Sequence, residues 1–212
     1  MGIALAEKGH EVHFISYSQP FRLDMFCDNT FFHEVTVPDY PLFDYTPYEL
    51  NLTSKLVDVV RHEGLNLLHV HYAIPHASAA IQAKLILETY GINIPIVTTL
   101  HGTDITLLGK DKSFKPVIEY AINKSDAVTA VSNDLRKETL SHFRINREIE
   151  MIPNFIDSNL YSQEVDEKLR SKIAKKEEKI VVHISNFRKV KRVEDVIKIF
   201  SKVQEKVPAK LL

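Results

Sequence analysis

The sequence has one cysteine and almost no net charge. Both properties narrow the classes of protein to which it can belong. Its 212 residues include a single cysteine, Cys27, which excludes an internal disulfide framework and suits a reducing compartment. Lysine and arginine number 27 against 28 aspartates and glutamates, a formal net charge of −1. A near-neutral chain argues against a general binder of nucleic acid or anionic membranes, so any anion site must be local.

Long apolar runs are also missing. No run is long enough to span a bilayer, and the N-terminus lacks the basic stretch followed by an apolar stretch that marks a signal peptide. We therefore expect a cytoplasmic protein with no stable membrane insertion.

Several catalytic and nucleotide-binding motifs are absent too. The sequence has no G-x-G-x-x-G and no G-x-x-x-x-G-K-[ST]. It has no G-x-S-x-G, which argues against a serine hydrolase of that type. Cys27 has no obvious base near it, so we expect no catalytic thiol.

Short apolar segments alternate with amphipathic ones along the chain. Strands are predicted at 12–16, 31–37, 67–71, 96–100, 127–131, 150–152 and 180–185, and helices at 47–62, 75–90, 114–124, 133–142 and 193–205. This alternation predicts an α/β fold with a parallel, doubly wound sheet.

Composition changes after residue 153. The segment opens with Pro-Asn-Phe-Ile-Asp and becomes highly charged to residue 178, which is typical of a linker and a solvated helix. We therefore expect one domain at 1–155, and a linker with the start of a second domain at 156–212. Both ends look cut, because the opening helix has no strand before it and residues 209–212 resemble a strand just beginning.

Polar residues follow the predicted strands, where parallel sheets bind ligands. The sharpest group is His101-Gly-Thr-Asp104. Gly102 permits a tight turn, Thr103 or Asp104 can cap a short helix, and His101 then projects over the sheet. The alternative is that Gly102-Thr-Asp104 only forms a turn and a helix cap, and that His101 takes no part in binding.

Two other groups have the chemistry of a site. Arg188, Lys189, Lys191 and Arg192 lie between a strand and a helix start, which suits a diphosphate, although a solvated turn is the usual fate of such a run. His69 and His71 lie on one face of a strand near His76. They could bind a metal ion, but packing or hydrogen bonding is the stronger interpretation.

The order of these motifs resembles the retaining glycosyltransferases with two facing Rossmann-like domains, the glycosyltransferase B fold. The likeness covers essentially the whole chain and is carried by His69-Val-His-Tyr72, His101-Gly-Thr-Asp104, Ala130-Val-Ser132, Pro153-Asn-Phe-Ile-Asp157 and Ser185-Asn-Phe-Arg-Lys-Val-Lys-Arg192. It implies a nearly complete N-terminal, acceptor-side domain and only the beginning of a nucleotide-sugar domain.

The resemblance implies transfer of a sugar from a nucleotide diphosphate to a hydroxyl, with retention and without a metal ion or cofactor. The missing D-x-D, an acidic pair of many metal-dependent enzymes of this class, agrees with that. The likeness is strongest to the branch that opens bacillithiol biosynthesis, which implies UDP-N-acetylglucosamine as donor and L-malate as acceptor. It leaves homo-oligomerisation open.

The resemblance also assigns roles to individual residues. Lys191 matches the family's diphosphate lysine, Arg188 assists it, and His101 lies by the donor sugar; fixed cations near the leaving group supply electrostatic catalysis. Ser132, Asn154 and Asn186 are expected on the donor side, with Asn186 standing where many relatives carry arginine. Tyr72, Thr103 and Asp104 are expected to line the acceptor pocket.

The family's Gly-rich loop would precede Met1 and its acidic E-x₇-E region would follow Leu212, so we expect this polypeptide to be inactive by itself. Three alternatives stay open. One is a related glycosyltransferase with another small or lipid acceptor. Another is a metal-dependent hydrolase using His69 and His71 with His101 or Asp104. The last is a non-catalytic binding fragment.

Overall fold

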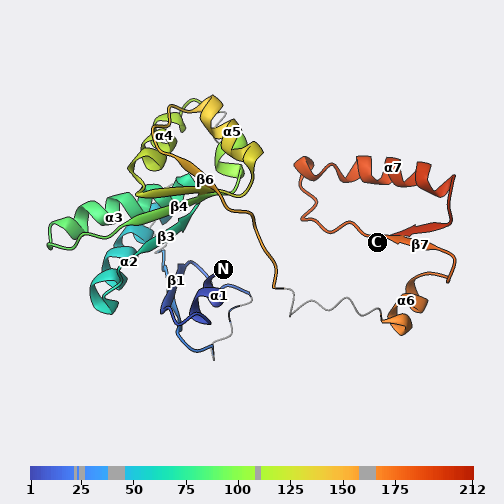
Figure 1. Cartoon of the computed structure of the whole chain (residues 1–212), viewed down its shortest axis with the longest axis horizontal. Helices are drawn as coiled ribbons and strands as arrows, with labels where there is room; N and C mark the ends of the chain where they lie inside the picture. Colours follow the sequence, from blue (N-terminus) through green and yellow to red (C-terminus); the bar gives the residue numbers. More distant parts are fainter. Residues whose placement is uncertain (22, 24–26, 38–45, 108–110, 158–165) are drawn as a thin grey trace. The chain divides into compact units, whose positions relative to one another are not determined.

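The computed structural model describes residues 1–21, 23, 27–37, 46–107, 111–157 and 166–212. The chain forms two compact units, Met1–Phe155 and Ile156–Leu212 (Figure 1). All described strand pairs are parallel, which confirms the predicted parallel α/β class. No helix in the described part of the chain is both long and apolar enough to cross a membrane.

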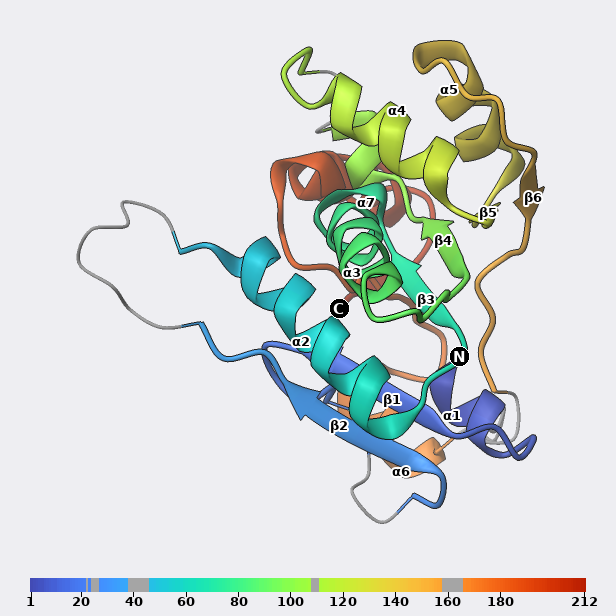
Figure 2. The same ribbon diagram turned by 90° about the vertical axis from the view of Figure 1, so that its left-hand side faces the viewer.

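A two-stranded sheet and a long helix open the first unit. Helix α1 (Gly2–Ala6) leads into β1 (Val12–Ser16), which pairs with β2 (Thr30–Glu34). Helix α2 (Tyr48–Glu63) follows and contacts both β1 and α3, as Figure 2 shows from a second direction. This helix therefore joins the small sheet to the rest of the unit.

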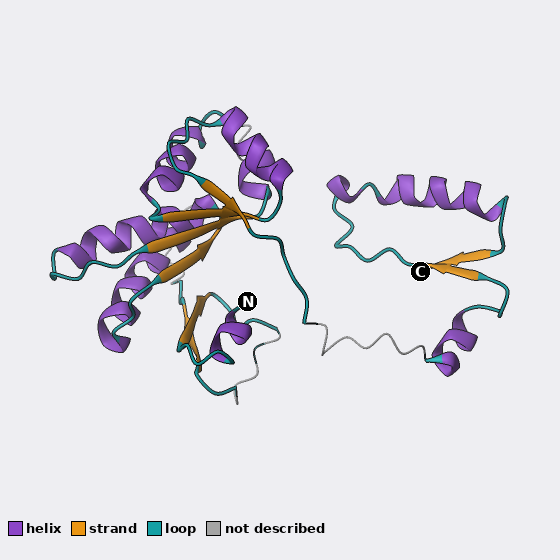
Figure 3. Cartoon of the chain, in the orientation of Figure 1, coloured by secondary structure: helices purple, strands orange, loops and turns teal. Residues whose placement is uncertain are grey.

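The main sheet has four strands in sequence order. They are β3 (Leu68–His71), β4 (Ile96–Leu100), β5 (Ala127–Ala130) and β6 (Ile149–Met151) (Figure 3). Strand β4 is buried along nearly its whole length, as expected for an apolar β-branched run inside a parallel sheet. Helices α3 (Ser78–Glu88), α4 (Lys115–Lys124) and α5 (Asn133–His142) complete the layers.

The core of the first unit lies between these helices and β4. Its largest fully buried side chains are Leu87, Ile94, Ile96, Leu100, Ile105, Ile118, Ile122 and Ile149. Each such side chain contributes about 1.5–3 kcal/mol by leaving water. Helix α3 turns Ala79, Ala80 and Ala83, all fully buried, toward its neighbours. These small residues let α2 and α4 approach it closely.

The predicted helix 75–90 is wrong at its start. Residues Ala73–Ala77 form an irregular helical turn, in which Ile74 is extended (φ −132°, ψ 143°) and the Ile74–Pro75 peptide is cis. Regular helix therefore begins only at Ser78. At the other end Gly91 takes φ +75°, which confirms the predicted glycine stop.

The second unit consists of α6 (Glu167–Ile173), β7 (Lys179–Val181), α7 (Val193–Gln204) and β8 (Ala209–Leu211). The predicted strand 180–185 is too long, because its partner β8 spans three residues and the ladder ends where His183 N–H donates to the Leu212 carbonyl. Helix α7 agrees with its prediction to within one residue. Among the unit's described residues only Ala174 and Ala209 are buried hydrophobics.

Candidate active site

The loops after β3 and β4 bring two predicted site residues together. In the parallel register His71 lies opposite Thr99, so the ends of the two strands reach the same level. His71 Nδ1 is 2.8 Å from His101 Nε2. The Tyr72 ring lies 5.0 Å from the His101 ring, centroid to centroid. An imidazole pair and a phenol therefore share one edge of the sheet.

Asp104 ties these two loops to each other. Asp104 is buried, with only 1% of its surface exposed. Oδ2 accepts a hydrogen bond from Ala73 N–H (2.8 Å), and Oδ1 accepts one from Gly102 N–H (3.2 Å). Burial raises the pKa of this carboxyl, whereas the backbone amides and His101 oppose that shift. The contacts of Asp104 are those of a positioning residue, while the adjacent Thr103 is exposed.

Backbone conformation explains two residues of these loops. Gly102 has φ +116°, and a Cβ placed there would meet only Leu135 Cδ1, at 4.0 Å. Glycine is therefore favoured by the dihedral and not by lack of space. Tyr72 adopts φ +77° and ψ 140°, which costs about 1–3 kcal/mol for a residue with a side chain. Its N–H donates to the Thr99 carbonyl at 2.9 Å and holds it there.

A row of polar side chains continues from His71 across the sheet. The rings of His69 and His71 stack with centroids 4.9 Å apart, which confirms that both lie on one face. His69 Nε2 is 2.8 Å from Thr99 Oγ1, which lies 2.8 Å from Thr129 Oγ1. His76 Nδ1–H donates to the His71 carbonyl at 2.7 Å. Each of these groups thus has a partner within the protein.

Burial keeps these imidazoles neutral. Desolvation, together with the neighbouring His69, His101 and His76, lowers the pKa of His71 to about 4. Desolvation also lowers the pKa values of His69, His76 and His101, and in the last case Asp104 opposes it. At neutral pH the His71–His101 contact is therefore a hydrogen bond between two neutral rings, and His101 can accept or donate a proton.

His69, His71 and His76, together with His13, line a largely apolar cleft of about 230 Å³. The cleft lies between β1 and β3, and α2 contributes Leu52 and Leu56 to its wall. Ile15, Leu68 and Val70 supply further apolar surface. An apolar hollow with a few converging polar groups is a common form of small-molecule site.

The hydrolase alternative finds little support in this geometry. His71 and His101 share a hydrogen bond and His69 shares one with Thr99, but no third ligand with metal-site spacing joins them among the described residues. Within the described residues, the group of side chains with metal-ligand spacing is a different one, His13, His33 and Glu63. His69, His71 and His101 are best interpreted as a hydrogen-bonded row.

The remaining predicted residues lie in three places. Ser132 caps α5, with its Oγ accepting from Leu135 N–H at 3.1 Å, and Asn154 is exposed just after β6. In the second unit, Asn186, Arg188 and Lys191 are all exposed.

Arg188 and Lys191 belong to one tight turn. Lys191 N–H donates to the Arg188 carbonyl at 2.7 Å, and both side chains are exposed. The two cations can thus approach one anion together. The neighbouring Arg192 has its own partner, because its Nε lies 2.6 Å from Asp195 Oδ2.

Sequence comparison places the fold and these loops in a known family. A model described as Glycosyltransferase Family 4 matches residues 1–160. The match covers most of the chain and includes every predicted site residue of the first unit. The chain belongs to this family.

Two curated relatives are informative. The chain is 50% identical over its whole length to N-acetyl-alpha-D-glucosaminyl L-malate synthase of Bacillus anthracis, covering 55% of that protein. It is 26% identical to an uncharacterized glycosyltransferase of Methanocaldococcus jannaschii, over 75% of this chain and 42% of the relative. The chain spans about half the length of the curated relatives it matches.

Solved structures show the same fold at low identity. Sucrose-phosphate synthase from Thermosynechococcus elongatus matches 99% of this chain and 53% of its own, with a TM-score of 0.71 and 16% identity. A glycosyltransferase from Rickettsia africae matches 100% of this chain and 62% of its own, with a TM-score of 0.66 and 15% identity. The fold is therefore that of glycosyltransferases with Rossmann-like domains.

Proposed function

We propose that this chain is part of an enzyme that transfers N-acetylglucosamine from UDP-N-acetylglucosamine to the hydroxyl of L-malate. The observation that carries the proposal is the 50% identity, over the whole chain, to a protein named for that product. The proposal includes retention at the anomeric carbon, chemistry without a metal ion, a cytoplasmic location and a place at the first step of bacillithiol biosynthesis.

In this reaction the bond from the anomeric carbon to the UDP oxygen breaks and UDP takes the electron pair. A new bond forms to the malate hydroxyl oxygen, which loses its proton. Negative charge develops on the diphosphate, so fixed cations stabilise the transition state. We assign this role to Lys191 and Arg188, which share one exposed turn, and place the neighbouring Asn186 at the donor. The second unit is then the nucleotide-sugar side.

The first unit is proposed to supply the acceptor side. Tyr72, which directly follows the cleft-lining His71, and the exposed Thr103 are assigned to the acceptor. His101 is assigned to the donor sugar, where a neutral imidazole held by His71 can donate or accept a hydrogen bond. Ser132 and Asn154 follow β5 and β6 and are kept on the donor side. Asp104 acts through the loops that it holds.

A chimera tests the proposal. This chain replaces the matching part of the Bacillus anthracis relative, and UDP release is measured with L-malate and with other hydroxy acids. We expect UDP release that depends on L-malate and falls by about 10²–10³-fold in Lys191→Ala, the loss typical of one group that stabilises developing charge. The control is Lys189→Ala, which removes the neighbouring cation and leaves Lys191 in place.

A chimera that folds but gives no stimulation by malate would contradict the acceptor assignment. Stimulation by another small hydroxy compound or a lipid would replace malate with that acceptor and keep the family chemistry. A requirement for added Mg²⁺ or Mn²⁺ in the sugar transfer would contradict the metal-independent chemistry.

A further inference from the structure

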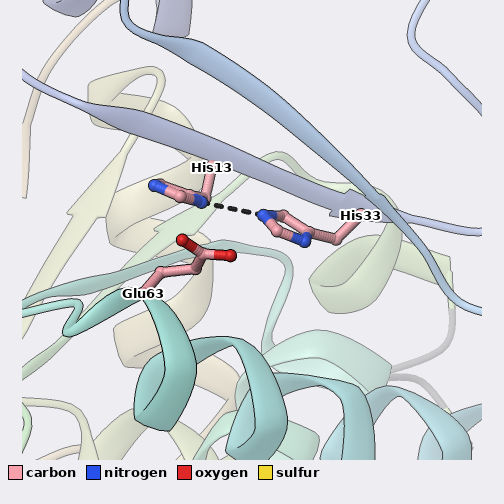
Figure 4. A group of neighbouring side chains, drawn as sticks. All are labelled: His13, His33 and Glu63. Atoms are coloured by element: carbon pink, nitrogen blue, oxygen red, sulfur yellow. Dashed lines mark hydrogen bonds between the residues drawn. The ribbon is translucent and has the colours of Figure 1, made fainter.

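A second cluster of titratable side chains lies on β1, β2 and the end of α2, and its His13 lines the same cleft as His69, His71 and His76. His13 from β1, His33 from β2 and Glu63 at the end of α2 each offer one ligand atom, and these atoms all lie within 4.8 Å of one another. Figure 4 shows the two rings side by side, with the Glu63 carboxylate beside them. Three separate elements of the fold thus converge on one point.

The spacing of the two rings is close to that of a metal site. His13 Nδ1 lies 2.8 Å from His33 Nε2. Two nitrogen ligands of a tetrahedral zinc ion, each about 2.0–2.1 Å from the metal, lie about 3.3 Å apart. To admit the ion, the two nitrogens must move apart by about half an ångström and both rings must tilt until their lone pairs point at the ion. Glu63 is exposed, so its side chain can rotate to close the third contact.

The contact of His13 with Glu11 favours the tautomer that can bind a metal ion through Nδ1. Its Nε2 lies 2.9 Å from Glu11 Oε1, and its side chain is only 1% exposed. When the Glu11 carboxylate accepts a hydrogen bond from Nε2–H, the lone pair of His13 is on Nδ1. Nδ1 is the atom that faces His33. Metal-binding histidines commonly have their second nitrogen held by a carboxylate in this way.

We propose that His13, His33 and Glu63 form a zinc site that fastens the β1–β2 pair to the end of α2. The ion takes the place of the shared proton between His13 Nδ1 and His33 Nε2. His33 then carries its proton on Nδ1, and a fourth position stays open to water. Two imidazoles and a carboxylate suit Zn²⁺ among the common ions. The zinc proposal does not depend on the proposed sugar transfer, and its test needs no substrate, although His13 also lines the cleft.

The test is a Zn²⁺ titration of the chain, freed of metal with chelator, in competition with a chromophoric chelator. We expect one zinc per chain. His33→Gln should weaken binding at least about 100-fold, since even outer partners of a metal site are worth about 10–100-fold. Glu63→Gln, which changes an exposed side chain and preserves the fold, should weaken it about 10-fold on the same scale.

His62→Gln is the matched control, because this exposed neighbour of Glu63 bonds the Asp58 carbonyl. It should bind zinc like the unaltered chain. Substitution of Co²⁺ gives a second readout, with the absorption bands of a tetrahedral site in the unaltered chain and weaker bands in Glu63→Gln at the same Co²⁺ concentration. Unchanged affinity in both Glu63→Gln and His33→Gln would overturn the proposal. So would loss of zinc in His71→Gln alone, which would place the ion at the other histidine cluster.

Discussion

The two units of the chain differ in how much apolar surface they bury. In the first unit, Leu87, Ile96, Leu100 and Ile118 have no exposed surface. In the second unit the described residues bury two alanines as their hydrophobic core. The difference goes together with one of composition, because the second unit contains the highly charged segment that ends at residue 178.

The second unit exposes the residues that would normally form its core. Ile184 is 90% exposed, Phe187 72% and Ile199 63%. Its sheet has two strands, and a pair of strands by itself is marginally stable in water. The second unit therefore has regular helices and strands, but the burial of apolar side chains that stabilises the chain lies almost entirely in the first unit.

The largest expected effect comes from separating the two units. A polypeptide of residues 1–155 should unfold cooperatively in urea, because it retains the buried core. A polypeptide of residues 156–212 should show no sigmoidal transition by circular dichroism. A cooperative transition in the short polypeptide would break the comparison between the units.

Two matched substitutions compare what one apolar side chain contributes to stability in each unit. Leu100→Ala removes a fully buried side chain from β4 and should lower the free energy of unfolding by about 2–5 kcal/mol. Ile199→Ala removes a side chain that is 63% exposed and should change it by no more than about 0.5 kcal/mol. Urea denaturation of the full chain measures both, and similar losses would show that α7 is buried by some other surface.

A smaller effect should appear on acidification, again in the first unit. Burial lowers the pKa of His71 to about 4 from an unfolded value of 6.5. In this window the unfolded state binds more protons, so stability is complete above pH 6.5 and falls as the pH drops toward 4. Between pH 7 and pH 5 this one group accounts for up to about 2 kcal/mol. The lowered pKa values of His69, His76 and His101 act in the same direction.

Asp104 acts in the opposite direction, because its raised pKa makes the folded state bind more protons at low pH. Urea unfolding at pH 7 and pH 5 checks the sum of these effects. His71→Gln should lose less stability on acidification than the unaltered chain, whereas His62→Gln, at an exposed position, should lose the same amount. An equal loss in all three would remove His71 as the cause.

The sequence predicted best those elements whose signals are local. Helix α5 spans Asn133–His142 as expected, because the Ser132 hydroxyl caps it within three residues. Strand β4 begins and ends where its apolar run does. The start of α3 was wrong, because the irregular turn at Ala73–Ala77 packs against several elements of the unit and no local pattern encodes it.

The candidate site was predictable in its residues more than in its contacts. The H-x-H pattern and the loop at His101 indicated where polar groups gather. The bond between His71 and His101 depends on the register of β3 with β4, which no short motif contains. The bonds of Asp104 to two backbone amides were missed for the same reason, since one of them spans 31 residues. Likewise, His13 and His33 lie 20 residues apart and meet only through strand pairing.

The two hydrogen bonds that Asp104 accepts from backbone amides determine which substitutions this site can tolerate. The position of both loops depends on one carboxylate and on groups that every non-proline residue carries, namely the N–H of Ala73 and of Gly102. The exposed neighbours, such as Thr103, take no part in these hydrogen bonds. Substitutions at these exposed side chains can therefore alter the surface of the site without removing the carboxylate that holds the two loops.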